Sequence, residues 1–366
     1  MASEFDLKHI CCMKDLKKLK KAGASAEEIR RAHAKLCKNN KQSKKATKKF
    51  LNLNWSCIAF SLHQIKKLAE QGANLNVKDK EGDTLLHEVC SCIPCSAKEV
   101  KFLVKCGADV NARDKKGNTP LLLVSGYNSV KILRFLVAHG ADVNARNKKG
   151  VTPLYQACHF GEIESVMFLL EQGANLCVKT KCGETLLHAA TESGNTKLVK
   201  FLVEQGLGVN EKSVNGNTPL HNASECCPEM TEYLINAGAR VNAENLNGQT
   251  PLHKASIWGC LKSAKYLIAH GAQMNAKNRC GRTPLHESVR CHPDLAGYLA
   301  LQGADPHVKD IRGRTAFDMA PDYNSVVILK NAYEARQEEV RSGTTRHGLS
   351  LLSVLAGWCK AHQRSE

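Results

Sequence analysis

A short motif that returns at intervals of about 33 residues constrains this chain more than any other feature of its sequence. Each copy contains a glycine and, two residues later, a threonine, and the glycines lie 35, 33, 33, 33, 32, 33 and 32 residues apart. A second set of glycines, each followed by alanine or leucine, repeats at the same intervals. Repeats of this length indicate an array, because one unit is too small to bury its apolar face and must stack on its neighbours. The motif glycines are Gly82, Gly117, Gly150, Gly183, Gly216, Gly248, Gly281 and Gly313.

Each copy predicts a polar turn followed by two short antiparallel helices. The polar residues before the glycine favour a turn in which glycine takes a positive φ. Thr218 and Pro219 are typical of an N-cap and a first helical position. Apolar residues at helical spacing in 198–203 indicate the second helix, and Gly206 then ends it.

The sequence Thr-Pro-Leu-His-x-Ala is complete at 218–223 and 250–255, and 283–288 differs only by Ser288. With these motifs the chain resembles the ankyrin-repeat family over roughly residues 51–340. The resemblance implies an all-α solenoid of helix-turn-helix units with β-hairpin-like turns and short helical flanks. Both ends depart from the pattern, since the first unit lacks the motif and the last reads Thr315-Ala-Phe-Asp318. Such atypical end units are expected where one face meets water.

We therefore divide the chain into two flanks and an array. The predicted segments are a basic N-terminal helical hairpin (1–37), a basic linker (38–50), a degenerate first unit (51–78), seven full repeats (79–113, 114–146, 147–179, 180–212, 213–244, 245–277 and 278–309), a capping unit (310–340), and a C-terminal tail with a short apolar helix (341–366).

The charge of +17 is unevenly distributed along the chain. Residues 1–50 carry 15 Lys/Arg and 5 Asp/Glu, so a basic arm precedes a nearly balanced body. The sequence contains no typical signal peptide and no apolar run of the roughly 18 residues that a membrane span needs. We expect a monomer in the cytoplasm, with the nucleus as a second location, and mostly free thiols among the 17 cysteines.

The stretch His87-Glu-Val-Cys-Ser-Cys-Ile-Pro-Cys95 has the composition of a metal site. In the repeat register, however, His87 occupies the motif histidine column and Cys90 a column of small packing residues. Cys92 and Cys95 remain in the loop between two helices, without the second Cys-x-x-Cys pair that zinc sites usually have. Metal binding by these two thiols with Cys106 stays the alternative, and we predict no metal and no cofactor.

Function is predicted to lie on the surface of the array. No P-loop, dinucleotide-binding glycine motif, nucleophile elbow or zinc-protease motif is present, so no catalytic residue is predicted. The resemblance implies that turn tips and first-helix ends contact partners. The lysine-rich tips favour an acidic protein surface, with a merely solvated basic edge as the alternative. The predicted partner-binding residues are Lys80, Lys115, Lys116, Tyr127, Lys148, Lys149, His159, Phe160, Lys181, Ile257, Trp258, Arg279, Arg282, Arg290, Arg312 and Arg314.

Asn111 and Asn144 resemble asparagines that are hydroxylated in animal ankyrin proteins, although a structural role in the turns is the simpler interpretation. The leading hypothesis is a non-enzymatic scaffold or adaptor that binds partner proteins on the concave surface of the array. The alternatives are a nuclear or transcriptional regulator using the basic arm, and a pathogen effector or ubiquitin-ligase substrate adaptor. Direct nucleic-acid binding is disfavoured, because no aromatic residues interleave with the lysine runs.

Overall fold

The computed structural model describes residues 45, 47, 66–67, 69–92, 95–127 and 129–342. The described residues form helices and turns without a β-strand, which confirms the all-α repeat fold, and a single antiparallel bridge joins Lys179 and Thr185. None of these helices is both long enough and apolar enough to cross a membrane. The chain divides into unit 1, residues 1–207, and unit 2, residues 208–366.

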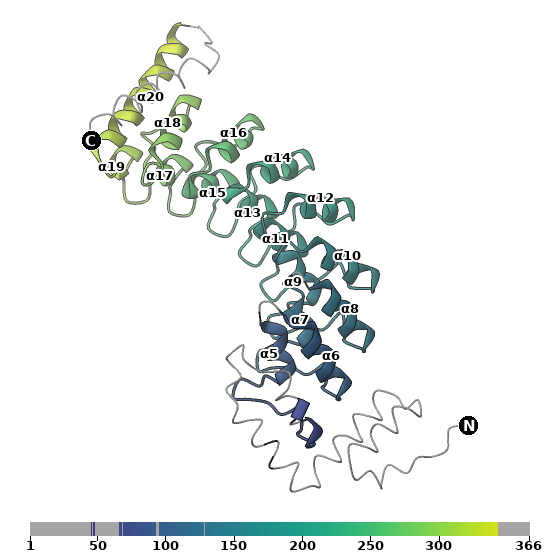
Figure 1. Ribbon diagram of the computed structural model, residues 1–366. Coiled ribbons are helices and arrows are strands. Elements are labelled where there is room, and N and C mark those ends of the chain that lie inside the picture. Colours follow the sequence, from purple (N-terminus) through teal and green to yellow (C-terminus); the bar gives the residue numbers. More distant parts are fainter. Residues whose placement is uncertain are drawn as a thin grey trace, which may run out of the picture. The chain divides into compact units, whose positions relative to one another are not determined.

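Unit 1 contains four described helix pairs. The first helices of successive pairs pack on one another, as α5 does on α7 and α7 on α9, and each second helix packs against its own first helix. First helices lie along one side of the unit and second helices along the other (Figure 1). The pairs are α5 (Leu85–Ser91) with α6 (Ala97–Lys105), α7 (Pro120–Val124) with α8 (Val130–Ala138), α9 (Pro153–His159) with α10 (Ile163–Glu171), and α11 (Leu186–Glu192) with α12 (Thr196–Glu204).

Unit 2 repeats this arrangement and ends differently. In its last helix pair the first helix, α19, is short, whereas the second helix, α20, has 20 residues and packs along α18. The expected shortened closing unit therefore has a short first helix but a long second helix, because no glycine interrupts residues 323–342. The pairs are α13 (Pro219–Cys226) with α14 (Pro228–Asn236), α15 (Pro251–Trp258) with α16 (Leu261–Ala269), α17 (Pro284–Ser288) with α18 (Pro293–Gln302), and α19 (Ala316–Met319) with α20 (Tyr323–Ser342).

Four motif histidines, His87, His221, His253 and His286, each connect their repeat to the next. The Thr250 amide donates to Nδ1 of His253 (3.1 Å), and Nε2 of His253 lies 3.0 Å from the carbonyl oxygen of Arg282 in the next repeat. An amide can only donate and a carbonyl can only accept, so the imidazole is neutral with its proton on Nε2. Burial lowers the pKa of His253 to about 4, and it also lowers the pKa of His286. Both ring nitrogens are thus used by the fold.

The same geometry occurs at the histidine of the cysteine-rich stretch. His87 is buried, with Nδ1 accepting from the Thr84 amide (3.2 Å) and Nε2 3.1 Å from the Asn118 carbonyl oxygen. Cys90 is fully buried, as its column predicts, and the Cys95 thiol donates to the Val89 carbonyl (3.1 Å). The imidazole is therefore occupied by backbone partners.

Some sequence predictions fall outside the described residues or need adjustment. The N-terminal hairpin, nearly all of the linker and the C-terminal apolar helix lie outside them. Cys226 is the last residue of α13, and only Cys227 separates it from α14. Pro228 accounts for this, because proline suits the first turn of a helix and starts α14 at once.

Candidate functional site

The turns between repeats carry the most accessible side chains of the predicted set. We define the two residues before each motif glycine as the first and second tip residues. In the turn of Asn147, its Oδ1 accepts from the amide of the second tip residue Lys149 (2.9 Å) and from that of Val151 (3.0 Å). Asp79, Asn245, Asn278 and Asp310 make the same pair of bonds. An Asp or Asn side chain thus fixes the shape of each of these tips.

Successive tips within a unit are joined by their backbones. In unit 1 the Lys115 amide donates to the Glu81 carbonyl (2.9 Å). In unit 2 the Leu246 amide donates to the Asn215 carbonyl (2.9 Å). Glycine permits this approach, because it takes a positive φ and because a Cβ on Gly82 or Gly216 would lie 2.8 Å from the next tip's amide nitrogen. The tips of each unit therefore form a hydrogen-bonded row.

In unit 1 this row is basic. All four first tip residues are lysines, and two of the second tip residues are lysines as well. Every one of these side chains is exposed, and the positive charge of Lys116 acts to lower the pKa of Asp83. We call the six residues the lysine row: Lys80, Lys115, Lys116, Lys148, Lys149 and Lys181.

In unit 2 the same positions are mostly aliphatic. Val214 is 61 % exposed, Leu246 53 % and Ile311 72 %, and Arg279 is the fourth first tip residue. These three aliphatic residues are not among the partner-binding residues predicted from the sequence. The available signal was the repeat register, which places them in the column of the unit 1 lysines. We call Val214, Leu246, Arg279 and Ile311 the aliphatic row.

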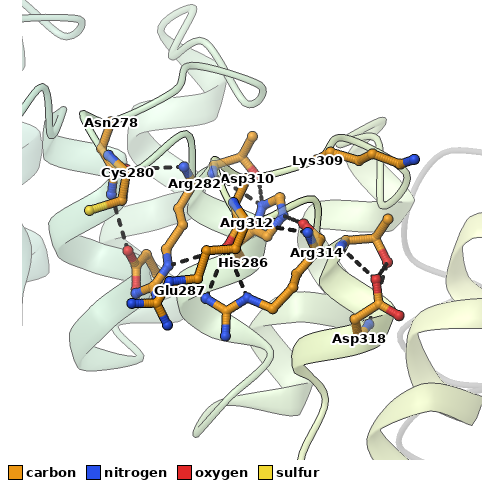
Figure 2. A network of polar contacts seen from close by, with 12 residues as sticks. Asn278, Cys280, Arg282, His286, Glu287, Lys309, Asp310, Arg312, Arg314 and Asp318 are labelled. Atoms are coloured by element: carbon orange, nitrogen blue, oxygen red, sulfur yellow. Dashed lines mark hydrogen bonds and ion pairs between the residues drawn. The ribbon is translucent and has the colours of Figure 1, made fainter.

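The predicted arginines of unit 2 fall into two groups. Arg314 binds the buried Asp310 carboxylate through Nε (3.1 Å) and NH2 (2.9 Å), while Arg282 lies 3.9 Å from that carboxylate and 3.7 Å from Glu287 (Figure 2). Arg279 and Arg312 are exposed, and their guanidinium groups make no bond within the described residues. Arg282 and Arg314 therefore have partners inside the chain, and Arg279 and Arg312 do not.

Asp310 is the centre of the polar network that Figure 2 shows. Burial alone would raise the pKa of this carboxyl group, but the amides of Arg314 and Arg312 and the Arg314 guanidinium lower it to about 2. The carboxylate consequently stays charged at ordinary pH. Its stabilising bonds are complete above the unfolded pKa of about 3.9 and are lost only as the pH falls toward about 2.

The first-helix ends of unit 1 form a small aromatic group. The Phe160 ring covers Gly126 and lies 5.8 Å from the Tyr127 ring, yet it remains 46 % exposed. His159, the last residue of α9, is exposed, and its Nδ1 lies 3.2 Å from the Glu192 carboxylate. Phe160 thus packs partly on the preceding repeat and also faces solvent.

The corresponding residues of unit 2 are more open. Trp258, the last residue of α15, is 59 % exposed, and no aromatic ring of the described residues pairs with it. Ile257 is half-buried, and its carbonyl accepts from Nε2 of His292 (3.0 Å). Arg290 is exposed two residues after α17 ends. Trp258 is therefore the largest exposed apolar side chain described in either unit.

The candidate modification sites are occupied by structural bonds. The Asn111 amide donates to the Gly140 carbonyl (2.8 Å) and accepts from the Asp142 amide (2.8 Å). Asn144 makes the equivalent bonds to Gly173 (3.1 Å) and Asn175 (2.9 Å). Both asparagines bridge neighbouring repeats, as the structural interpretation predicts, and their hydroxylation stays a prediction.

Three carboxyl groups of the described residues lie close together and form an acidic cluster. Oxygens of Asp79, Asp83 and Glu88 lie within 4.8 Å of one another, and Oδ1 of Asp79 already accepts two turn amides. Burial raises the pKa of Asp83 and Glu88. No thiol joins this cluster, so the described cysteines are not assembled around it.

Comparison with known proteins agrees with this architecture. A family model for ankyrin repeats, three copies long, matches residues 53–147, 95–180, 176–245 and 227–310. No curated protein matches the chain significantly. Repeats of this family generally serve as protein–protein interaction modules and are typically not enzymes. Because the matched residues cover well over half of its length, the chain belongs to the ankyrin-repeat family.

Proposed function

We propose that the chain is a monomeric, non-enzymatic scaffold that binds an acidic surface of a partner protein along the lysine row of unit 1. The observation that carries the proposal is the row itself, since the tips are joined by backbone hydrogen bonds and their six lysine side chains are exposed. Such positive groups speed and orient the encounter with a negative surface.

The rigidity of the row supports this proposal. Flexible lysines on separate loops would lose conformational freedom on binding, which weakens an interaction. Here the backbone under each lysine is already fixed, by the Asn147 side chain within one tip and by the Lys148 amide bond to the Lys116 carbonyl between tips. Only the side chains remain to be ordered.

The exposed aromatic side chains add a second contribution. Aromatic residues are frequent among those that dominate binding energy. Phe160 in unit 1 and Trp258 in unit 2 are each about half exposed or more. We expect Phe160 to contact the partner of the lysine row, because it belongs to the same unit. Arg282 and Arg314 are omitted from the proposed surface, since Asp310 holds them.

The test is binding of a labelled glutamate-rich peptide to the full chain, followed by fluorescence anisotropy at several salt concentrations. The triple variant Lys115→Glu, Lys148→Glu and Lys181→Glu is expected to weaken binding on the order of 100-fold at low salt, because it reverses three aligned charges. The affinity of the unmodified chain is expected to fall as salt rises.

A matched control separates the lysine row from total charge. The triple variant Lys98→Glu, Lys131→Glu and Lys197→Glu makes the same change in net charge on exposed residues near the starts of α6, α8 and α12. Glutamate suits these helix N-termini, so the fold is expected to persist. Equal losses in both triple variants would refute a specific role for the row.

The alternatives that use the basic N-terminal arm depend on residues outside the described part of the chain. No observation on the described residues favours them.

A further inference from the structure

The aliphatic row of unit 2 is a second exposed surface that the proposed function does not use. Its four residues occupy equivalent positions in successive repeats. Each tip donates a backbone amide hydrogen bond to a carbonyl of the preceding tip: Leu246 to Asn215, Arg279 to Asn247 (2.9 Å) and Ile311 to Cys280 (3.1 Å). In this order the row presents two aliphatic side chains, one guanidinium and a further aliphatic side chain. Neither tip position of unit 2 carries an acidic residue.

We propose that the aliphatic row binds an extended segment of another protein in polyproline II conformation, with aliphatic residues at every third position and an acidic residue in phase with them. The aliphatic side chains would lie against Val214, Leu246 and Ile311, and the acidic one against Arg279. Covering these exposed branched side chains favours binding, because it removes their apolar surface from water.

The spacing of the repeats determines the conformation of the segment. Packed helices lie about 8–10 Å apart, so neighbouring tips are separated by about that distance. Polyproline II rises about 3.1 Å per residue with three residues per turn, so every third side chain returns to the same face after about 9 Å. In a β-strand successive side chains alternate, so side chains three residues apart would point to opposite faces of the strand.

An α-helix fits the row less well. Seven residues of a helix rise about 10.5 Å, but the side chains then drift by about 20° at each heptad. Over the three intervals of this row the drift accumulates, whereas polyproline II accumulates none. Polyproline II is also populated by unfolded chains, so the segment loses less conformational freedom on binding.

The exposed arginines indicate that the polar residue of the bound segment is acidic. Arg279 and Arg312 are exposed, and their guanidinium groups make no bond within the described residues, whereas Asp310 already holds Arg314. A carboxylate in the bound segment would give Arg279 the two-point hydrogen bonding that guanidinium groups favour. A basic segment would meet two unpaired positive charges instead.

The experiment is selection of a random peptide library displayed on phage against the full chain. The enriched sequences are expected to share aliphatic residues three positions apart and one acidic residue in phase. Enrichment of aliphatic residues seven positions apart would show a helical ligand and overturn the proposed conformation. Failure to enrich any shared pattern would overturn the binding surface itself.

Variants then locate the binding site of a selected peptide. Leu246→Lys and Ile311→Lys are each expected to weaken binding on the order of tenfold or more. Lysine occurs naturally in this column at Lys115, Lys148 and Lys181, so folding is expected to persist and is checked by thermal unfolding. Unchanged affinity in both variants would contradict the proposal.

A charge exchange tests the acidic contact. Arg279→Glu is expected to weaken binding of the selected peptide, and changing the peptide's acidic residue to lysine should restore it. Absence of restoration would refute the pairing with Arg279. Lys148→Leu in unit 1 is the matched control and is expected to leave this peptide's affinity unchanged. The outcome is independent of the lysine row, so either proposal can fail while the other holds.

Discussion

Units 1 and 2 have the same tip backbone but present different side chains on it. In both, an amide–carbonyl bond joins consecutive tips and glycine permits the close approach. In unit 1 the first tip residues are four lysines, and in unit 2 they are Val214, Leu246, Arg279 and Ile311. The first tip residues are exposed in both units and are not part of the core, so their side chains can differ without affecting the fold. The difference shows where a stacked array can specify partners without disturbing its fold.

A second column differs between the units in a way that does affect the fold. Unit 2 has His221, His253 and His286 in succession, whereas unit 1 has Leu122 and Tyr155 at the equivalent positions between its two motif histidines. The Tyr155 hydroxyl donates to Glu184 (2.7 Å) instead of to a backbone carbonyl. We therefore expect the two units to respond differently to acid.

The largest predicted effect is the acid sensitivity of unit 2. With a folded pKa of about 4 and an unfolded value of about 6.5, His253 binds fewer protons in the native state than in the unfolded state between these pH values. Its contribution to stability is complete above pH 6.5 and falls as the pH decreases, by about 3 kcal/mol near pH 4. Hydrogen exchange of peptides from α15 and α17, compared with α7 and α9 over this range, measures the difference.

His253→Gln is the control for this prediction, because glutamine does not titrate. The variant is expected to lose stability at pH 7 but to show a weaker dependence on pH. Equal acid sensitivity of the two units in the unmodified chain would argue against the contrast between their histidine columns.

The next effect concerns the backbone contact between consecutive tips, which occurs in both units. Gly216→Ala is expected to cost about 2–3 kcal/mol, since alanine is strained at φ +77° and its Cβ would press on the Leu246 amide. Gly82→Ala should cost about the same in unit 1, where the Lys115 amide is equally close. Urea unfolding of both variants measures these losses.

Gly313→Ala sharpens the same comparison. Its φ is also positive, but nothing lies within 4 Å of the added Cβ, so only the conformational strain of about 1 kcal/mol remains. A cost equal to that of Gly216→Ala would mean that the tips are not held together as described.

The smallest predicted effect is that of exchanging the tip residues. Replacing Lys115, Lys148 and Lys181 with aliphatic residues, and Val214, Leu246 and Ile311 with lysine, is expected to change stability by only about 0.5 kcal/mol per site, because these side chains are exposed. Thermal unfolding measures the change. A large loss would show that the columns serve the fold rather than recognition.

The sequence predicts the repeat fold well because its signals are local. Threonine, proline and glycine at fixed positions determine where helices begin and end, and Thr218 with Pro219 illustrates this at α13. The structural role of the histidine column and the burial of Cys90 also follow from the register. Periodicity alone therefore predicts that His87 and Cys90 serve the fold.

The remaining features depend on distances that no local pattern contains. Arg282 and Arg314 carry the same charge as Arg279 in the sequence, yet only the structure shows that Asp310 engages the first two. Leu246 looks like a core residue until its exposure is known. The packing of α20 along α18 is likewise a contact between different repeats.

The most direct test of the account is the binding footprint of the tip-exchange variant. Hydrogen exchange with and without the glutamate-rich peptide is expected to show protection at the tips of unit 1 in the unmodified chain. In the variant, protection should move to the tips of unit 2, because the lysines have moved there. Protection that stays in unit 1, or that falls on α6, α8 and α12 in both the unmodified chain and the variant, would contradict the claim that the tip side chains determine which partner binds.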